Sequence, residues 1–347
     1  MSLIVDIRKR LGEFQLDVQL RAEHETLALL GASGCGKSVT LRCIAGILKP
    51  DDGHIELDGT VLFDSAARIN LPPQKRRIGY LFQQYALFPH MTVRQNIAVA
   101  VTDRAKRGVV TEEKLRQFHL EDAADKLPRQ ISGGQQQRAA LARIFASGPA
   151  AILLDEPFSA LDSYLKYQLE TELYDTLEQF PGSVLWVSHD RSEVWRNCPR
   201  VCVIDRGKSS PVDSMRHLFE RPESESAARL SGCKNFARAL PDGESVHLPE
   251  WDLTLRCGRT VSPEIHVVGI RSHHLFPVEV PAENTISCFV IRTIDDVFGT
   301  IILLRPEGAT ADAPPLRMEL SREAWEPWAS AQRVTVCVSP QNILLLK

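Results

Sequence analysis

Hydrophobic positions follow two different patterns along this chain. Before about residue 230, short unbroken apolar runs such as 27–30 and 151–154 alternate with segments of helical periodicity, which is typical of a parallel sheet covered by helices. From Cys233 onward, apolar and polar residues alternate in short segments, which is typical of antiparallel strands. The pattern predicts an α/β domain over residues 1–230 and a small all-β, barrel-like domain over 231–347.

Local signals refine this division. From about residue 84 to 146 the periodicity is helical, which predicts a helical subdomain. Asp58-Gly59 lies between two alternating runs and predicts a β-hairpin, and Pro222–Ser226 predicts a hinge. The expected helices cover Val93–Val101, Glu112–His119, Gln136–Ala146 and Ser214–Glu220, and the expected C-terminal strands cover Thr285–Ile294, Gly299–Leu304, Leu316–Leu320, Val334–Val338 and Asn342–Leu346.

A glycine-rich segment lies between an expected strand and an expected helix. It follows the pattern G-x-x-x-x-G-K-[ST], in which backbone N–H groups surround nucleotide phosphates and the helix N-terminus favours anions. Lys37 would reach the terminal phosphates and the Ser38 hydroxyl would bind Mg²⁺. A flexible loop is the alternative, but strand, loop, Lys-Ser pair and helix all agree. The predicted ATP-binding residues here are Gly31, Ala32, Ser33, Gly34, Cys35, Gly36, Lys37, Ser38 and Val39.

Two adjacent carboxylates end the second apolar run, which covers Ala151 to Leu154. Ligands bind at the carboxyl ends of parallel strands, so Asp155 is predicted to hold Mg²⁺ and Glu156 to polarise the water that attacks the γ-phosphate. Alone, the pair could be two solvated acids. The phosphate-binding segment upstream makes the chemical interpretation stronger.

The string Ser132-Gly133-Gly134-Gln135 lies just before the acidic strand and opens a helix-forming stretch. Alone it is a common helix N-cap. In this order it resembles the signature motif of the ATP-binding-cassette (ABC) family, with Ile131 where that pattern usually has Leu. The resemblance implies that two copies pair head to tail, so that one copy's Gly31–Ser38 and the other's Ser132–Gln135 hold the same ATP.

Smaller motifs of the family occur in the expected order. The resemblance implies that Gln83 contacts the metal and couples the site to a partner subunit. It also implies that Asp162 lies in the loop between paired domains and that His189 contacts the γ-phosphate. The expected catalytic residues are therefore Glu156, His189 and Gln83, and the expected metal ligands are Ser38, Gln83 and Asp155. The family's adenine-stacking aromatic residue is replaced: Arg10 or Leu11 lies nearest its place, with Phe14 as the other candidate.

Two further regions resemble importer ATPases. The apolar segment Gln84–Met91 resembles the surface that binds a helix of the membrane partner, although it could instead fold back onto its own domain. The C-terminal β-rich region resembles an accessory, TOBE-like β-domain, with Val268–Arg271 as its most recognisable string. This implies a homodimer on the cytoplasmic face of the inner membrane, bound peripherally to two integral-membrane permease subunits and served by a periplasmic or lipid-anchored solute-binding protein. The stretches Leu57–Asp64 and Leu71–Tyr80 are similar to ATPases of molybdate and sulfate uptake, with iron, spermidine/putrescine and sugar as alternative solutes.

Composition narrows the alternatives. With Lys+Arg 41 against Asp+Glu 44, the net charge is −3, which offers no basic field for nucleic acid. The eight cysteines are scattered and resemble reduced structural residues, with Cys35 as the potentially reactive exception. His273-His274 alone cannot form a metal site, and no apolar run is long enough to cross a bilayer. A soluble, non-transport ABC ATPase is the alternative class; a phosphate-loop kinase would leave Ser132–Gln135 without a role.

Overall fold

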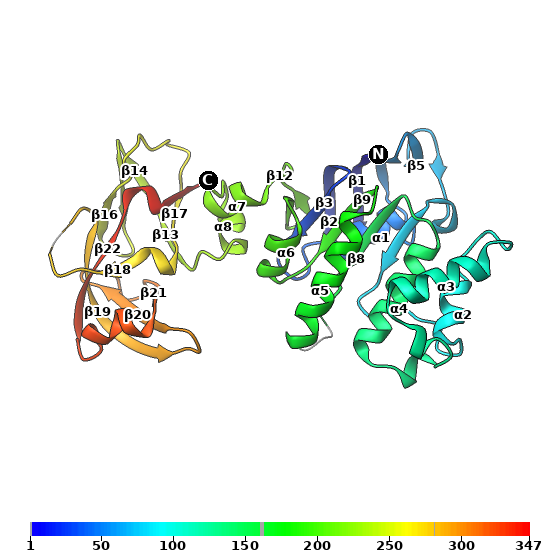
Figure 1. Ribbon diagram of the computed structural model, residues 1–347. Coiled ribbons are helices and arrows are strands. Elements are labelled where there is room, and N and C mark those ends of the chain that lie inside the picture. Colours follow the sequence, from blue (N-terminus) through cyan, green and yellow to red (C-terminus); the bar gives the residue numbers. More distant parts are fainter. Residues whose placement is uncertain (1, 160–162, 281) are drawn as a thin grey trace. The chain divides into compact units, whose positions relative to one another are not determined.

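The computed structural model describes residues 2–159, 163–280 and 282–347. The chain divides into two units, Met1–Met215 and Arg216–Lys347 (Figure 1). Residues 216–230, which the hydrophobic pattern placed in the first domain, group with the second unit. Part of the reason is that α8 (Glu225–Leu230) packs against β17 (Val267–Ile270).

The first unit is built on a large mixed sheet in the order β6-β5-β4-β1-β2-β11-β10-β3-β9-β8-β7, with β12 beside β10. The strands from β10 to β7 pair in parallel. Every residue of β8 and β9 is buried, which explains their unbroken apolar sequences. The strands are β1 (Ser2–Leu11), β2 (Phe14–Glu23), β3 (Thr26–Leu30), β4 (Asp52–Leu57), β5 (Thr60–Asp64), β6 (Ile69–Asn70), β7 (Ile78–Leu81), β8 (Ala151–Asp155), β9 (Ser183–Val187), β10 (Arg200–Asp205), β11 (Lys208–Ser209) and β12 (Asp213–Ser214).

The predicted hairpin is confirmed: β4 and β5 pair around Asp58 and Gly59, whose φ angles are 52° and 76°. Both residues therefore adopt the left-handed conformation that tight hairpin turns require. The β4–β5 hairpin of the antiparallel part thus follows directly from a two-residue turn signal.

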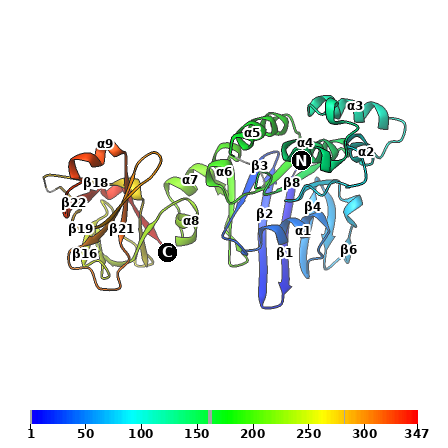
Figure 2. The same cartoon turned by 90° about the horizontal axis from the view of Figure 1, so that it is seen from below.

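Helices α2, α3 and α4 pack on one another and form the helical subdomain (Figure 2). The expected helix over Glu112–His119 is wrong at its start, because α3 begins at Arg107. Its first turn is mostly exposed, and its two apolar residues, Val109 and Val110, are adjacent, so this turn lacks the apolar spacing of a helix. The helices of this unit are α1 (Lys37–Ala45), α2 (Val93–Ala98), α3 (Arg107–Gln117), α4 (Gly133–Ala146), α5 (Ser163–Glu178) and α6 (Arg191–Asn197), with α7 (Met215–Glu220) at the boundary and short 3₁₀ turns at Pro73–Lys75, Glu121–Ala123 and Pro128–Gln130.

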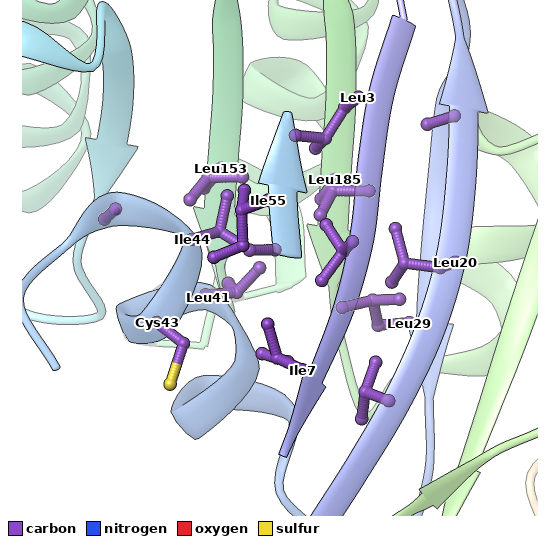
Figure 3. Close-up of a cluster of buried hydrophobic side chains, with 14 of the residues drawn as sticks. Leu3, Ile7, Leu20, Leu29, Leu41, Cys43, Ile44, Ile55, Leu153 and Leu185 are labelled. Atoms are coloured by element: carbon purple, nitrogen blue, oxygen red, sulfur yellow. The ribbon is translucent and has the colours of Figure 1, made fainter. Parts of the chain in front are cut away.

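A single apolar core joins α1 to both parts of the sheet. Leu41 and Ile44 of α1 lie beside Ile7, Ile55 and neighbouring strand residues (Figure 3). All four of these side chains are fully buried, and burying a side chain of this size contributes about 1.5–3 kcal/mol. The core therefore fixes the direction in which the N-terminus of α1 points.

Arg76 closes the other end of α1. Its side chain is buried, and Nη1 donates hydrogen bonds to the carbonyl oxygens of Cys43 (2.9 Å) and Ile44 (2.8 Å). These carbonyls lie in the last turn of the helix, where carbonyl oxygens lack the usual partner four residues further on. A buried cation thus caps the helix that carries the phosphate-binding segment.

The second unit consists of antiparallel sheets around a core that contains the fully buried Trp251, so the all-β, barrel-like prediction is confirmed. Sheet orders are β13-β17-β23, β14-β15-β16 and β18-β22-β19-β20-β21. The strands are β13 (Asn235–Arg238), β14 (Leu240–Asp242), β15 (Ser245–Leu248), β16 (Leu253–Arg256), β17, β18 (Leu275–Pro277), β19 (Thr285–Asp295), β20 (Thr300–Pro306), β21 (Leu316–Leu320), β22 (Arg333–Val338) and β23 (Ile343–Leu346), with α9 (Arg322–Trp325) and 3₁₀ turns at Ser272–His274, Glu326–Trp328 and Pro340–Asn342.

Candidate nucleotide-binding site

The glycine-rich segment connects β3 to α1 in a conformation that needs glycine. At Gly31 an added Cβ would lie 2.2 Å from the carbonyl oxygen of Ile204, and Gly36 has a φ of 114°, which side chains disfavour. Gly36 is also the N-cap of α1, and no side chain caps this helix. Its first backbone N–H groups therefore remain available to an anion such as a phosphate.

Lys37 and Ser38 lie at the start of α1. The buried Lys37 ammonium donates hydrogen bonds to the carbonyl oxygens of Gly31 (2.7 Å) and Ala32 (3.0 Å). The Cys35 thiol is buried and lies 3.7 Å from the same ammonium, so it is shielded from reagents in solution. Lys37 thus holds the segment Gly31–Ser38, called the cradle below, in the compact curve that phosphate binding requires.

The structure brings Ser38 and Asp155 together, as predicted for two metal ligands. Ser38 Oγ donates a hydrogen bond to Asp155 Oδ1 at 2.9 Å. Tyr80, which the sequence motifs did not indicate, donates its hydroxyl to Asp155 Oδ2 at 2.8 Å. Burial and the Asp155 charge raise the pKa of Tyr80 well above its usual value, so it stays a donor. Hydroxyl and carboxylate oxygens in this arrangement fit Mg²⁺.

Three predicted residues meet at one carboxylate oxygen. Gln83 Nε2 donates a hydrogen bond to Glu156 Oε2 at 3.3 Å, and His189 Nδ1 lies 3.5 Å from the same oxygen. Glu156 has a φ of 51° and its N–H donates to the carbonyl oxygen of Val187 (2.9 Å). This left-handed turn at the end of β8 aims the carboxylate toward the end of β9, where His189 follows.

The cradle and Glu156 border a cleft of about 580 Å³, a size common for small-molecule sites. Both Leu11 and Phe14 line it, whereas Arg10 does not and instead donates Nε to the carbonyl oxygen of Gly12. Of the three adenine-contact candidates, Leu11 and Phe14 therefore line the cleft. The lining residues are Leu11, Phe14, Gly31, Ser33, Gly34, Gly36, Lys37, Ser38, Val39, Glu156 and His189.

The signature segment does not line this cleft. Ser132 caps α4 in a capping box: its Oγ accepts from the Gln135 N–H (3.3 Å), and Gln135 Oε1 accepts from the Ser132 N–H (3.0 Å). Ser132 and Gly133 are exposed, whereas Gly134 is buried. Asp162 lies outside the described residues. One chain thus forms a cleft to which its own Ser132–Gln135 contribute nothing.

The apolar segment 84–91 has mixed exposure. Tyr85 is buried, whereas Phe88 is 46% exposed. Asn96, fully buried on α2, donates Nδ2 to the carbonyl oxygens of Phe88 (3.2 Å) and Met91 (3.0 Å) and accepts from the Phe88 N–H (2.8 Å). Part of the segment therefore packs onto its own domain, and the rest is presented on a fixed support.

In the second unit, Arg271 acts within the fold. Its buried guanidinium donates to the carbonyl oxygen (2.7 Å) and the hydroxyl (3.0 Å) of Ser231. Burial lowers the pKa of both His273 and His274, the latter to about 4, so both rings are neutral near pH 7. Among the described residues, no group of His, Cys, Asp and Glu is arranged to hold a metal ion.

All eight cysteines, each in a described position, are buried and unpaired, in line with structural thiols. No helix in the described part of the chain has the length and apolar character needed to span a bilayer.

An uncapped helix behind a glycine loop, with Ser38, Asp155 and Glu156 around it, defines a phosphate-loop nucleotide-binding domain. Residues 15–159 match the family model described as ABC transporter. The matched residues lie within the first unit, which has the fold of an ABC cassette.

Three curated relatives are ATP-binding proteins of import systems. The spermidine/putrescine import ATP-binding protein PotA of Nitratidesulfovibrio vulgaris is 41% identical over 65% of this chain. The molybdenum import ATP-binding protein ModC of Paramagnetospirillum magneticum is 38% identical over 61%, and the Fe(3+) ions import ATP-binding protein FbpC of Haemophilus influenzae is 42% identical over 60%. In each case the match spans 60% of the relative's length.

A solved structure shares the fold. It is a dimeric, post-hydrolysis state of the ATP-binding cassette MJ0796 bound to ADP and Pi, with a TM-score of 0.52 and 29% identity. The match covers 62% of this chain and 99% of that one. The similarity therefore concerns the cassette and does not extend to most of the C-terminal unit.

Proposed function

We propose that this chain is the ATP-hydrolysing subunit of an ABC importer. The observation that carries the proposal is the meeting of Gln83 and His189 at the Glu156 carboxylate, beside the cradle. A carboxylate in this position can accept a proton from the attacking water, and the neighbouring donors orient it. The relatives named as import ATP-binding proteins support the assignment.

Each residue has a role in this proposal. The cradle N–H groups and Lys37 bind the phosphates; Ser38, Asp155 and Gln83 bind Mg²⁺. The metal, when bound, neutralises charge on the transferring phosphoryl group. Tyr80 holds one Asp155 oxygen, which leaves the other facing Ser38. Glu156 accepts the proton, and His189 contacts the γ-phosphate.

The active form is proposed to be a head-to-tail homodimer. Ser132, Gly133, Gly134 and Gln135 of one copy would complete the cleft of the other, and Asp162 would lie at the contact. The exposure of Ser132 and Gly133 supports this arrangement, as does the dimeric state of the MJ0796 cassette. Donors added across the interface would stabilise charge on the phosphoryl group and exclude water.

The dimer is proposed to act at the cytoplasmic face of the membrane with two permease subunits and a solute-binding protein. The exposed part of segment 84–91 would bind the permease. Molybdate or sulfate is the proposed solute, supported by the sequence stretches noted above and by the ModC relative. The PotA and FbpC relatives match as well, so polyamine or iron import is the alternative within the same class.

Reconstitution tests the proposal. The chain is co-expressed with candidate permease subunits and inserted into vesicles, and ATP-dependent uptake of molybdate, sulfate, spermidine and Fe³⁺ is measured. Uptake of one solute establishes an importer; hydrolysis without uptake or permease binding would favour a non-transport ABC ATPase. Met91→Glu should reduce uptake but keep basal hydrolysis, whereas Val109→Glu, at a 73% exposed position outside the segment, should change neither.

A further inference from the structure

The residues after Gln83 form a tight and strained turn. The Tyr85 N–H donates to the carbonyl oxygen of Phe82 at 2.9 Å, and the Ala86 N–H donates to that of Gln84 at 2.6 Å. Tyr85 and Ala86 have φ angles of 57° and 48°, in the left-handed region that costs about 1–2 kcal/mol for each non-glycine residue. Two such residues in succession persist only where surrounding contacts hold them.

Arg143 supplies those contacts from α4. Its Nη1 donates to the carbonyl oxygen of Ala86 at 2.8 Å and its Nη2 to that of Tyr85 at 3.1 Å. The planar guanidinium suits two neighbouring acceptors, which a lysine ammonium serves less well. The same guanidinium lies 5.5 Å from the centre of the Phe88 ring, a favourable cation–π distance.

The hydrogen bonds of the Arg143 guanidinium go to the backbone of this turn. Among the described residues, no carboxylate lies within ion-pair distance of it. Burial lowers its pKa, but an arginine remains charged at any physiological pH. Its bonds to the two carbonyls are therefore charge-assisted, and the bond to Tyr85 is partly buried.

We propose that Arg143 is a positioning residue for ATP hydrolysis: by holding the carbonyls of Tyr85 and Ala86, it keeps Gln83 directed at Glu156. This inference rests on the function proposed above. Gln83 is exposed and reaches Glu156 across 3.3 Å, so its placement depends on the turn that carries it. Because Arg143 lies on α4, whose N-cap is Ser132, its bonds to the turn also link the signature segment to Gln83.

A double-mutant cycle tests the link. Arg143→Met keeps the apolar stem and removes the donors; kcat should fall about tenfold or more, with the KM for ATP within threefold. In a Gln83→Ala background the same substitution should add almost nothing, because the residue through which Arg143 acts is already gone. Arg143→Lys should recover part of kcat.

Controls separate positioning from folding. Arg94→Met removes a surface arginine of the same subdomain that pairs with Glu112 and Asp125, and it should leave kcat unchanged. Additive losses in the cycle, an unchanged kcat, or a loss of activity that follows thermal stability in both arginine variants would overturn the inference. If Gln83→Ala slows hydrolysis and Arg143→Met does not, only the inference fails. If Gln83→Ala hydrolyses normally, the proposed role of Gln83 fails as well.

Discussion

The N-termini of α1 and α4 both carry a glycine-containing motif, but only that of α4 has a side-chain cap. At α1 the N-cap is Gly36, and no side chain satisfies the first N–H groups. At α4 the N-cap is Ser132, which forms a complete capping box with Gln135. An uncapped helix start leaves its first N–H groups to water or to an external anion, whereas a capped one satisfies part of them with its own side chain.

This difference explains how the work is divided between the two motifs. Helix α1 begins at the cleft of its own chain, so in the proposed function its free N–H groups would be the primary phosphate site. Helix α4 starts with an exposed Ser132 and Gly133, which is suited to a second contact made later by another copy. In the proposed dimer, the motif at α1 binds the nucleotide of its own chain, and the motif at α4 contacts the nucleotide already bound by the other copy.

Glu156→Gln should cause the largest loss of hydrolysis among these variants. It leaves the starts of α1 and α4 intact and removes the proposed proton acceptor. We expect hydrolysis to fall by about 10²–10⁴-fold, with ATP binding kept and an ATP-dependent dimer accumulating. Phosphate release and light scattering measure the two results. Normal hydrolysis by this variant would show that Glu156 is not the base.

Lys37→Ala provides the contrasting variant, since it removes a charge at α1 alone. Loss of a charge-assisted hydrogen bond costs about 1.5–3 kcal/mol, so ATP affinity should weaken about 10- to 100-fold. Fluorescent-nucleotide titration measures this. Unchanged affinity would mean that the cradle binds phosphate without its lysine.

Substitutions at Ser132 separate its cap from its proposed contact with the other copy. Aspartate caps helices as well as serine does, so Ser132→Asp should keep thermal stability, but its charge would repel the partner's phosphate and reduce dimerisation and hydrolysis. Ser132→Ala should cost about 0.5–2 kcal/mol of stability. Thermal melts and hydrolysis rates of the two variants distinguish the roles; full activity of Ser132→Asp would contradict the contact.

His54 offers the smallest effect and lies away from both helix starts. Its hydrogen bond to Asp64 (2.9 Å) raises the pKa of His54 above its usual value. The resulting stabilisation is present below the unfolded pKa and is lost as the pH rises through the raised one. His54→Asn should therefore lower the melting temperature by about 2 °C or less at pH 6 and less at pH 8.5, without changing ATP affinity. A larger drop in melting temperature at pH 8.5 than at pH 6 would contradict this pH dependence.

The sequence predicted the cradle, the acidic strand and the all-β second unit, because each depends on local spacing or periodicity. Tyr80, Asn96 and Arg143 were missed, because their partners are set by how distant elements pack. Tyr80, for example, reaches Asp155 only because β7 pairs with β8. A buried polar residue in an apolar stretch was the available signal, but it did not identify the partner.

The contact between Gly31 and Ile204 bears on biosynthesis. Ile204 belongs to β10, which pairs in parallel with β3, and beyond it the Gly207 N–H donates to the carbonyl oxygen of Cys35 at 3.2 Å. The loop that receives nucleotide is thus completed by residues that leave the ribosome long after it. A nascent chain interrupted before β10 would carry every nucleotide motif and still lack one wall of the loop, so we expect a half-made cassette not to trap ATP prematurely.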